Sequence, residues 1–460
     1  MKKSIVILCV VQFVDVLGVT EVLTAAPQML RSLSAAGGAA SAVLTTYAMC
    51  FGGLLMVGAR LGDRFGHRRV LLSGLALFAA GSLCAATAGS LVALVAGRCL
   101  QGAAAAVSVP ASLRLLIAVT PSPGDRRAGM AAWSAAGAAA GASGFVVGGV
   151  LTQLGGWRVM FWMNLPLALF IAVGVLRSIT PRRCDHGAGL DLPGGLLFSA
   201  GVAGLVLGGS LLEPPAHAGP GVLTVAGGVG LLGAAACMER RARHPLITRQ
   251  ALRLPALRTG VGAALLNTAT TSSVAAIATL DLQRVQHLSP AAAGLRFLPL
   301  SLGGMAGAAL AAGTLRRLTA RPTIALGLSV IGGADAGLIA LHRSGWLMSL
   351  PIAIAGVGLG VSSVASNALG TDVGETLQAA AAGALNTAAQ LGTALGVAAL
   401  LLISADTSRI ALPLRGPALG WAAAALIAIG GATSIAAGAA TSGRRARSEA
   451  ARPGAPIPRA

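Results

Sequence analysis

The chain has 460 residues, of which 55% are apolar, 10% are charged and 64 are glycine, and its mean hydropathy is +0.79. Soluble domains are about 45–50% apolar, so this composition excludes an ordinary soluble protein and predicts one embedded in a lipid bilayer. The net charge of +20 is found in some nucleic-acid-binding proteins, but here the basic residues lie in short segments between apolar runs rather than in one basic patch. We therefore expect no nucleic-acid partner.

Apolar runs recur from one end of the chain to the other, and a helix needs about 20 such residues to cross the bilayer. Runs bounded by charged or Pro/Gly-rich breaks predict an all-α polytopic membrane protein with fourteen transmembrane helices. The predicted spans lie near 5–27, 41–59, 70–88, 91–113, 129–151, 159–179, 192–212, 221–238, 258–280, 291–313, 322–341, 347–368, 378–404 and 416–440.

An even number of spans places both termini on the same side of the membrane. If that side is the cytoplasm, the inside segments carry 26 of the 34 Lys and Arg residues, the outside segments carry 7, and Arg98 lies within a span. Cytoplasmic segments of membrane proteins are enriched in Lys and Arg. This distribution supports both the number of spans and a multi-pass protein of the cell membrane with both termini cytoplasmic.

The first predicted span carries two carboxylates. Asp15 lies about ten residues into the span, which is near the bilayer midplane at ~1.5 Å per residue. Glu21 is six residues further on and points roughly 120° away from Asp15. An ionised carboxylate is costly inside a bilayer, and this cost favours proton uptake. We therefore expect Asp15 to load and release a proton, with Glu21 as a second candidate for proton coupling.

Between the second and third predicted spans, residues 58–70 read GARLGDRFGHRRV. Topology accounts for the arginines but not for Asp63 among them, with Gly66 three residues later. Gly66 permits a tight turn with positive φ, and Asp63 can accept hydrogen bonds from guanidinium groups or from backbone N–H groups at a helix start. We predict a conformational gate formed by Asp63, Arg64, Gly66 and Arg68; topology anchoring alone is the alternative.

This loop resembles the one between spans 2 and 3 of the major facilitator superfamily, whose pattern is approximately G-x-x-x-D-R-x-G-R-R-R. Ala59 and His67 depart from that pattern. In the fourth span, Arg98 and Gln101 match the superfamily's R-x-x-Q-G pattern, in which the arginine is implicated in proton transfer. An arginine within a span costs about 2.5–3.5 kcal/mol on insertion scales, so Arg98 needs a partner or a water-filled cavity. The resemblance implies that it modulates proton binding at Asp15.

The fifth span, WSAAGAAAGASGFVVGGVL, is similar to the glycine-rich motif of the superfamily's antiporters, which ends in G-P-x-x-G-G. Gly144, Gly148 and Gly149 match the glycines, and Phe145 replaces the proline. The resemblance implies a conformational role for these glycines. Close packing of helices through small residues is the alternative.

Further motifs resemble the fourteen-span drug:proton antiporter branch, which includes multidrug and antibiotic efflux transporters. WRVMFWMNLP at 157–166 resembles its W-R-x-x-F-x-x-N-x-P signature at the start of span 6. Four further matches follow in order along the chain: LDLPGGLL (190–197), HPLITRQALR (244–253), LQRVQHLSPAAAGLRFLPL (282–300) and GALNTAAQLGTALGVA (383–398). Each motif is weak alone, but the ordered set covers nearly the whole chain.

Other polar residues within the spans could line a substrate path. Their alternative role is ordinary hydrogen bonding between helices. Asp335 belongs to this group because it is the remaining carboxylate within a span. The residues predicted for the path are Gln12, Gln101, Asn267, Asp335, Asn386 and Gln390.

The resemblance implies a major facilitator fold with four parts: an N-terminal six-helix bundle (1–184), two additional central helices (185–243), a C-terminal six-helix bundle (244–441) and a basic, disordered cytoplasmic tail (442–460). It implies a proton-coupled antiporter that exports drugs, antibiotics or related amphipathic molecules. A dedicated exporter of a single metabolite, and a non-transporting sensor or scaffold on the same fold, remain alternatives.

No catalytic constellation, metal-ligand spacing or G-x-x-x-x-G-K-[ST] phosphate loop occurs in the sequence. We therefore expect a transporter rather than an enzyme, with no cofactor or metal and with the proton gradient as its energy source. Its expected partners are a small-molecule substrate, protons and the lipid bilayer, with no obligate protein partner.

Overall fold

The computed structural model describes residues 2–35, 39–180, 192–211, 218–241, 254–404 and 416–450, and these residues form helices joined mostly by short turns. In chain order the long helices are α1 (Lys2–Ser32), α2 (Ala39–Phe65), α3 (His67–Ala86), α4 (Leu91–Val119), α5 (Pro123–Gly155), α6 (Arg158–Ser178), α7 (Leu192–Leu211), α8 (Ala218–Arg241), α10 (Pro255–Leu280), α11 (Pro290–Arg317), α12 (Ala320–Leu341), α13 (Ser349–Gly370), α14 (Glu375–Ser404) and α15 (Pro417–Ala450). A short π-helix, η2 (Asp281–Val285), extends α10, and a 3₁₀ turn, η3 (Gly345–Met348), precedes α13.

Every span predicted from the sequence coincides with one of these helices. Among the described residues, 12 helices are long and apolar enough to cross a membrane. The two parts of α2, bent by 51° between Leu55 and Val57, make a thirteenth if they count as one span. Within α7, Leu196–Leu205 is a further, shorter apolar helical segment among the described residues. The all-helical, multi-span prediction is therefore confirmed for the described part of the chain.

The helix boundaries follow from the residues at the turns. Ser90, Ser122 and Ser289 cap α4, α5 and α11, each accepting a hydrogen bond from a backbone N–H three residues later, as expected of N-cap serines. Gly66 has φ of 91° between α2 and α3. Because a side chain disfavours that conformation, the glycine allows the two helices to reverse direction within one residue, as the sequence predicts.

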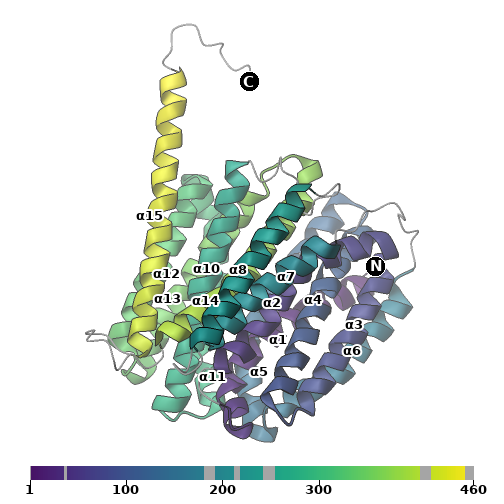
Figure 1. Ribbon diagram of the computed structural model, residues 1–460. Coiled ribbons are helices and arrows are strands. Elements are labelled where there is room, and N and C mark those ends of the chain that lie inside the picture. The colour runs from purple at the N-terminus through teal and green to yellow at the C-terminus, as the bar shows by residue number, and fades with distance from the viewer. Residues whose placement is uncertain are drawn as a thin grey trace.

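The packing of α1–α6 is repeated by α10–α15 (Figure 1). In the first set α3 packs on α4 and α6, α2 packs on α4, and α1 packs on α5. In the second set α12 packs on α13 and α15, α11 packs on α13, and α10 packs on α14. The two sets meet where α5 contacts α11 and where α2 contacts α14. Helices α7 and α8 pack against each other, and α7 lies against α2 and α14 at one of these two contacts.

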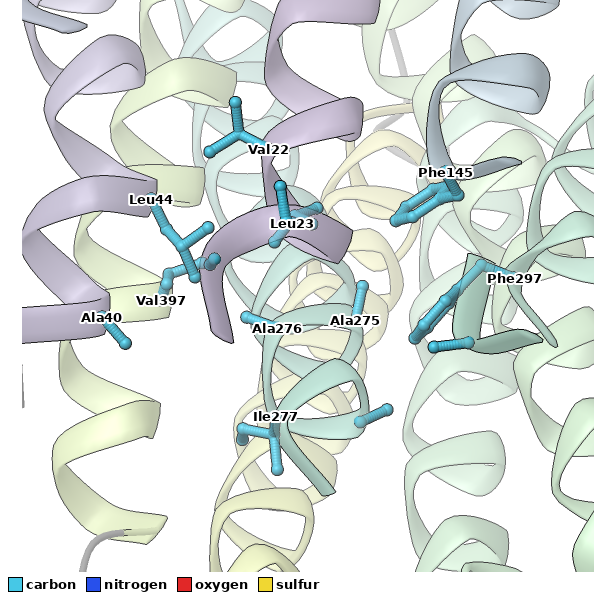
Figure 2. Close-up of a cluster of buried hydrophobic side chains, with 14 of the residues drawn as sticks. Val22, Leu23, Ala40, Leu44, Phe145, Ala275, Ala276, Ile277, Phe297 and Val397 are labelled. Carbon is cyan, nitrogen blue, oxygen red and sulfur yellow. The ribbon is translucent and has the colours of Figure 1, made fainter. Parts of the chain in front are cut away.

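One apolar cluster joins the two sets at a single end of the molecule. It contains the C-terminal parts of α1, α10 and α14 and the N-terminal parts of α2, α11 and α15. Figure 2 shows Leu23 of α1 among residues of this cluster from α2, α5, α10, α11 and α14. Toward the opposite end, the apolar residues of α1–α6 form one core, and those of α10, α12, α13 and α15 form another. We call the joined end the closed end.

The C-terminal region differs from the sequence-based prediction of a disordered tail from 442 to 460. Helix α15 continues to Ala450, so residues 442–450 are helical, and residues 451–460 lie outside the described part. Both α1 and α15 have their free ends on the side opposite the closed end (Figure 1). The predicted division points near 184 and 243 also fall outside the described residues.

Candidate functional site

A chain of buried polar side chains crosses the interior of α1–α4. The Tyr47 hydroxyl on α2 donates a hydrogen bond of 2.5 Å to Asp15 Oδ1 on α1. The Arg98 guanidinium on α4 lies over the Tyr47 ring, 4.5 Å from its centroid. Arg98 Nη1 donates to Gln101 Oε1 at 3.0 Å, and Gln101 Nε2 donates to Ser82 Oγ on α3 at 2.8 Å. The four helices thus share one polar network.

The charged members of this network are almost fully shielded from solvent. Asp15 is 7% exposed, Glu21 2% and Arg98 1%. Arg98 interacts electrostatically with Glu21, but within the described residues it has no carboxylate at salt-bridge distance. Its positive charge is instead balanced by the Tyr47 ring, the Gln101 amide and the more distant Glu21. A buried ion that lacks a close counter-ion is costly.

The glycines of the fifth span bring α5 close to α1 beside this network. A Cβ atom at Gly144 would meet the Thr20 side chain, and one at Gly148 would meet the backbone of Glu21. On another side of α5, a Cβ at Gly149 would meet the backbone of Pro290 in α11. Small residues allow such close helix approach in membranes. The motif therefore positions the α1 segment that carries Glu21.

Phe145, which replaces the motif's proline, stacks on Phe297 of α11 with ring centroids 4.9 Å apart. The two rings belong to the apolar cluster of the closed end and lie next to each other in Figure 2. In this chain the position therefore contributes an apolar contact between α5 and α11.

A small cavity of about 20 Å³ adjoins Asp15 and Tyr47. Its other lining residues are apolar except Ser108, whose buried hydroxyl has no hydrogen-bond partner in the structure. A cavity of roughly 10–15 Å³ is enough for one water molecule. The site therefore has room for a single water next to the Asp15 carboxylate.

A much larger cavity of about 620 Å³ lies between the two sets of helices. Leu23, Phe145 and Leu300 line it where it meets the closed end. Two of its other lining residues, Met305 and Asn367, are exposed. The cavity therefore meets the apolar cluster at one end and reaches Asn367, near the C-terminal end of α13, away from that cluster.

Helix α1 separates this large cavity from the buried carboxylates. Its cavity-lining residues form one helical face: Gln12, Val16, Val19, Thr20 and Leu23. At ~100° per residue, Asp15 points roughly 85° and Glu21 roughly 155° away from the mean direction of that face. Neither carboxylate lines the large cavity. One helix thus presents neutral groups to the cavity and acidic groups to the interior of α1–α6.

Of the residues predicted for a substrate path, Gln12 lines the large cavity. Asn267 lies one layer behind the wall, where its amide donates a 2.8 Å hydrogen bond to the lining residue Ser363. Gln101 belongs to the Arg98 network instead. Asn386 and Gln390 lie on α14 outside the lining, and Gln390 packs against Gly52 of α2.

Asp335 also lies outside the lining of the large cavity. It is fully buried on α12, and both of its carboxylate oxygens are without a hydrogen-bond partner in the structure. The sequence therefore identified a buried carboxylate at this position, but the structure places it in the interior of the second helix set and not on the cavity wall.

In the segment 58–70, which consists of the end of α2, Gly66 and the start of α3, the Asp63 carboxylate lies 3.3 Å from His67 Nε2. The Arg64 guanidinium lies over the Phe65 ring, 5.6 Å from its centroid. Arg68 Nη2 donates a 3.2 Å hydrogen bond to the Leu176 carbonyl at the end of α6. In this state the loop thus binds α6, and Asp63 is directed to the histidine that departs from the family pattern.

Sequence reasoning missed Tyr47 and Ser82. Tyr47 is the only tyrosine of the chain, and this rarity within a span is the signal that could have singled it out. Ser82 gives no such signal, because serines are common in these spans. Among the described residues, no three His, Cys, Asp or Glu side chains gather in a way that could hold a metal ion.

A bilayer-spanning helical array with a central cavity closed at one end defines a multi-span membrane transporter. Residues 8–397 match the family model described as Major Facilitator Superfamily. The chain belongs to this superfamily, whose members are transporters and not enzymes, and the resemblance seen in the sequence is confirmed.

Three characterised relatives are antibiotic resistance or export proteins of actinomycetes. The chain is 34% identical over 421 residues to the lincomycin resistance protein of Streptomyces lincolnensis, covering 87% of this chain and 84% of that protein. It is 33% identical over 425 residues to the cephamycin export protein CmcT of Amycolatopsis lactamdurans, with the same coverage. It is 32% identical over 425 residues to the puromycin resistance protein pur8 of Streptomyces alboniger, covering 90% and 84% of the two chains.

The fold is shared with solved peptide transporters. A peptide transporter POT in complex with sulfate superposes with a TM-score of 0.70 and 18% identity, covering 96% of this chain and 95% of that one. The POT family transporter PepTSo gives a TM-score of 0.70 and 16% identity, covering 96% and 98%.

Proposed function

We propose that this protein exports small amphipathic molecules, such as antibiotics or other drugs, in exchange for protons. The observation that carries the proposal is the buried Asp15–Tyr47–Arg98 network, separated only by α1 from a central cavity of about 620 Å³. The relatives are named for antibiotic resistance or export, which supports export rather than uptake. The proton gradient supplies the energy, and no cofactor takes part.

The membrane arrangement we propose has fourteen spans, with α1–α6 and α10–α15 as two six-helix bundles and α7–α8 as an additional pair. The repeated packing of the two sets supports this division. The excess of Lys and Arg at the end opposite the apolar cluster supports a cytoplasmic location for both termini. In this orientation the closed end faces outward and the cavity opens to the cytoplasm, so the structure corresponds to an inward-open state.

In the proposed cycle, Asp15 binds a proton arriving from outside and releases it to the cytoplasm. Arg98 acts on Glu21, the second acidic group, through its positive charge. Tyr47 links Arg98 to Asp15, because its ring lies under the guanidinium and its hydroxyl donates to the carboxylate. Because Asp15 and the cavity wall lie on different faces of α1, protonation acts on substrate binding through movement of this helix. The glycines 144, 148 and 149 keep α5 close enough to α1 and α11 for that movement to be shared.

The loop that carries Asp63, Arg64, Gly66 and Arg68 is proposed to stabilise the opposite state, in which the cytoplasmic end is closed. The bond between Arg68 and the Leu176 carbonyl holds the loop against α6 while this end is open. Asp63→Ala should slow export and leave the orientation in the membrane unchanged. Unchanged export would reduce the loop to a topology anchor.

The proposal is tested by substrate-dependent proton flux in proteoliposomes that contain the full-length chain and a pH-sensitive dye. Candidate substrates come from a drug-susceptibility panel in an efflux-deficient host that expresses the chain. Proton flux that begins only when a protective compound is added supports antiport. Protection by one compound alone would identify a single-metabolite exporter. Absence of both protection and flux across the panel would favour the sensor or scaffold.

A further inference from the structure

The wall of the large cavity carries many polar groups but no charged side chain. Its polar residues are all hydroxyls and amides, and no Asp, Glu, Lys, Arg or His is among the described residues that line it. Phe145 is its one aromatic residue in that set, and the ring is already stacked on Phe297. The wall is therefore polar, neutral and poor in free aromatic faces.

The hydroxyls of this wall mainly offer acceptor groups to a ligand. Thr268 donates to the Ala389 carbonyl at 2.6 Å, Thr271 to Asn267 O at 2.9 Å and Ser301 to Gly141 O at 2.8 Å. A hydroxyl that donates its hydrogen bond to a backbone carbonyl still carries two acceptor lone pairs. The complement of such a wall is a molecule with several O–H or N–H donors.

A permanent cation does not suit this cavity. Removing a cation from water is costly unless an anionic group or an aromatic face replaces its hydration. The two acidic residues of α1, Asp15 and Glu21, lie on other faces of this helix than its cavity-lining residues, and Asp15 already accepts a hydrogen bond from Tyr47. The wall therefore offers no anionic side chain, and its one aromatic ring among the described residues already has a face stacked on Phe297.

We propose that the cavity binds uncharged, drug-sized molecules that carry several hydroxyl or N–H donors, and that it discriminates against permanent cations. Its volume of about 620 Å³ lies within the range of roughly 300–1,000 Å³ usual for small-molecule sites. The inference rests on the proposed function in taking this cavity as the substrate site. It deepens that function by naming the substrate class.

The test measures binding to the purified full-length chain in lipid nanodiscs without a proton gradient. Chloramphenicol, which is neutral and carries two hydroxyls and an amide N–H, is compared with the permanent cations ethidium and tetraphenylphosphonium. The expected result is at least tenfold tighter binding of chloramphenicol. Equal or tighter binding of either cation would overturn the proposal. Because no transport is measured, a failure of proton coupling leaves the binding result unaffected. A failure of the predicted binding selectivity likewise leaves the proton-flux assay unaffected.

A charge-insertion variant tests the same claim independently of the neutral probe. Ser272 lines the cavity beside Thr393, 3.2 Å away, so Ser272→Asp places a carboxylate in the wall. We expect at least tenfold tighter cation binding than in the unmodified chain. Ser344→Asp, which adds the same charge at an exposed turn, should change nothing. If the unmodified chain binds no probe, the comparison of cation binding between Ser272→Asp and the unmodified chain tests the inference alone. No gain of cation binding in Ser272→Asp would then overturn the inference.

Discussion

Two helix pairs occupy matching places in the repeated packing, α1 with α4 and α10 with α13, yet they carry different kinds of polar group. The first pair holds Asp15, Glu21 and Arg98 in the interior. In the second pair, Asn267 donates a hydrogen bond to Ser363. The same framework thus supports an ionisable network in one half and a neutral, hydrogen-bonded wall in the other. We infer that proton chemistry is concentrated in the first half, whereas substrate contact involves both halves, with α1 bordering both the acidic network and the cavity.

The largest expected effect comes from removing the only cation of the buried network. Arg98→Gln keeps a polar side chain but removes the positive charge that acts on Tyr47 and Glu21. Export should fall by more than about tenfold, which corresponds to ~1.4 kcal/mol. Drug export from cells is the measurement, and Arg316→Gln at an exposed position in the last turn of α11 is the control. Normal export by Arg98→Gln would contradict the claim that the buried charges of the first half take part in export.

A methyl group at Gly148 tests whether α1 must stay close to α5. In Gly148→Ala the new Cβ would meet the Glu21 backbone, and overpacking of this kind costs roughly 1–3 kcal/mol. Both thermal stability in detergent and export should therefore fall. Gly430→Ala on α15 has no heavy atom within 4 Å of its Cβ and should be nearly neutral. Equal effects of the two variants would contradict the proposed contact.

Two substitutions of Tyr47 distinguish the contribution of its hydroxyl from that of its aromatic ring. Tyr47→Phe removes the hydroxyl bonded to Asp15 but keeps the ring under Arg98, whereas Tyr47→Leu removes both. Hydrogen bonds to charged groups contribute about 1.5–3 kcal/mol, so Tyr47→Phe should slow export by roughly tenfold, and Tyr47→Leu should slow it further. Initial rates of export provide the measurement. If Tyr47→Phe exports normally, the hydroxyl has no role in coupling.

The smallest effect is expected in the neutral half. Asn267→Ala removes one hydrogen bond to Ser363, worth about 1 kcal/mol, so export should decrease only a few-fold. The pH dependence of export should be unchanged, because no ionisable group is touched. A shifted pH profile for Asn267→Ala would show that proton coupling extends into α10. It would contradict the distinction between an ionisable first half and a neutral second half.

The sequence predicted the elements of this fold better than the orientation of each helix about its own axis. Apolar runs located each long helix of the described residues, because contact with lipid requires apolar side chains. Gly66 located a turn, because glycine tolerates positive φ. The rotational orientation leaves no clear mark on composition, since these helices are apolar toward lipid as well as toward their neighbours. For this reason the sequence does not indicate that Asn386, Gln390 and Asp335, which we predict for a substrate path, lie outside the lining of the large cavity.

The buried network was only partly predictable for a related reason. Asp15, Arg98 and Gln101 attracted attention because charge or motif spacing is conspicuous within a span. Tyr47 and Ser82 join them only through contacts between helices distant in the chain. Such contacts depend on how α2 and α3 pack against α1 and α4, which the sequence of a single span does not specify.

The central claim is that Asp15 couples protons to transport without binding the substrate itself. It is tested most directly by comparing two modes of transport in proteoliposomes that contain Asp15→Asn, with Asp372→Asn at an exposed position as the control. The account predicts that Asp15→Asn abolishes transport driven by a pH gradient but still exchanges labelled for unlabelled substrate across the membrane. Undiminished pH-driven transport by Asp15→Asn would contradict it.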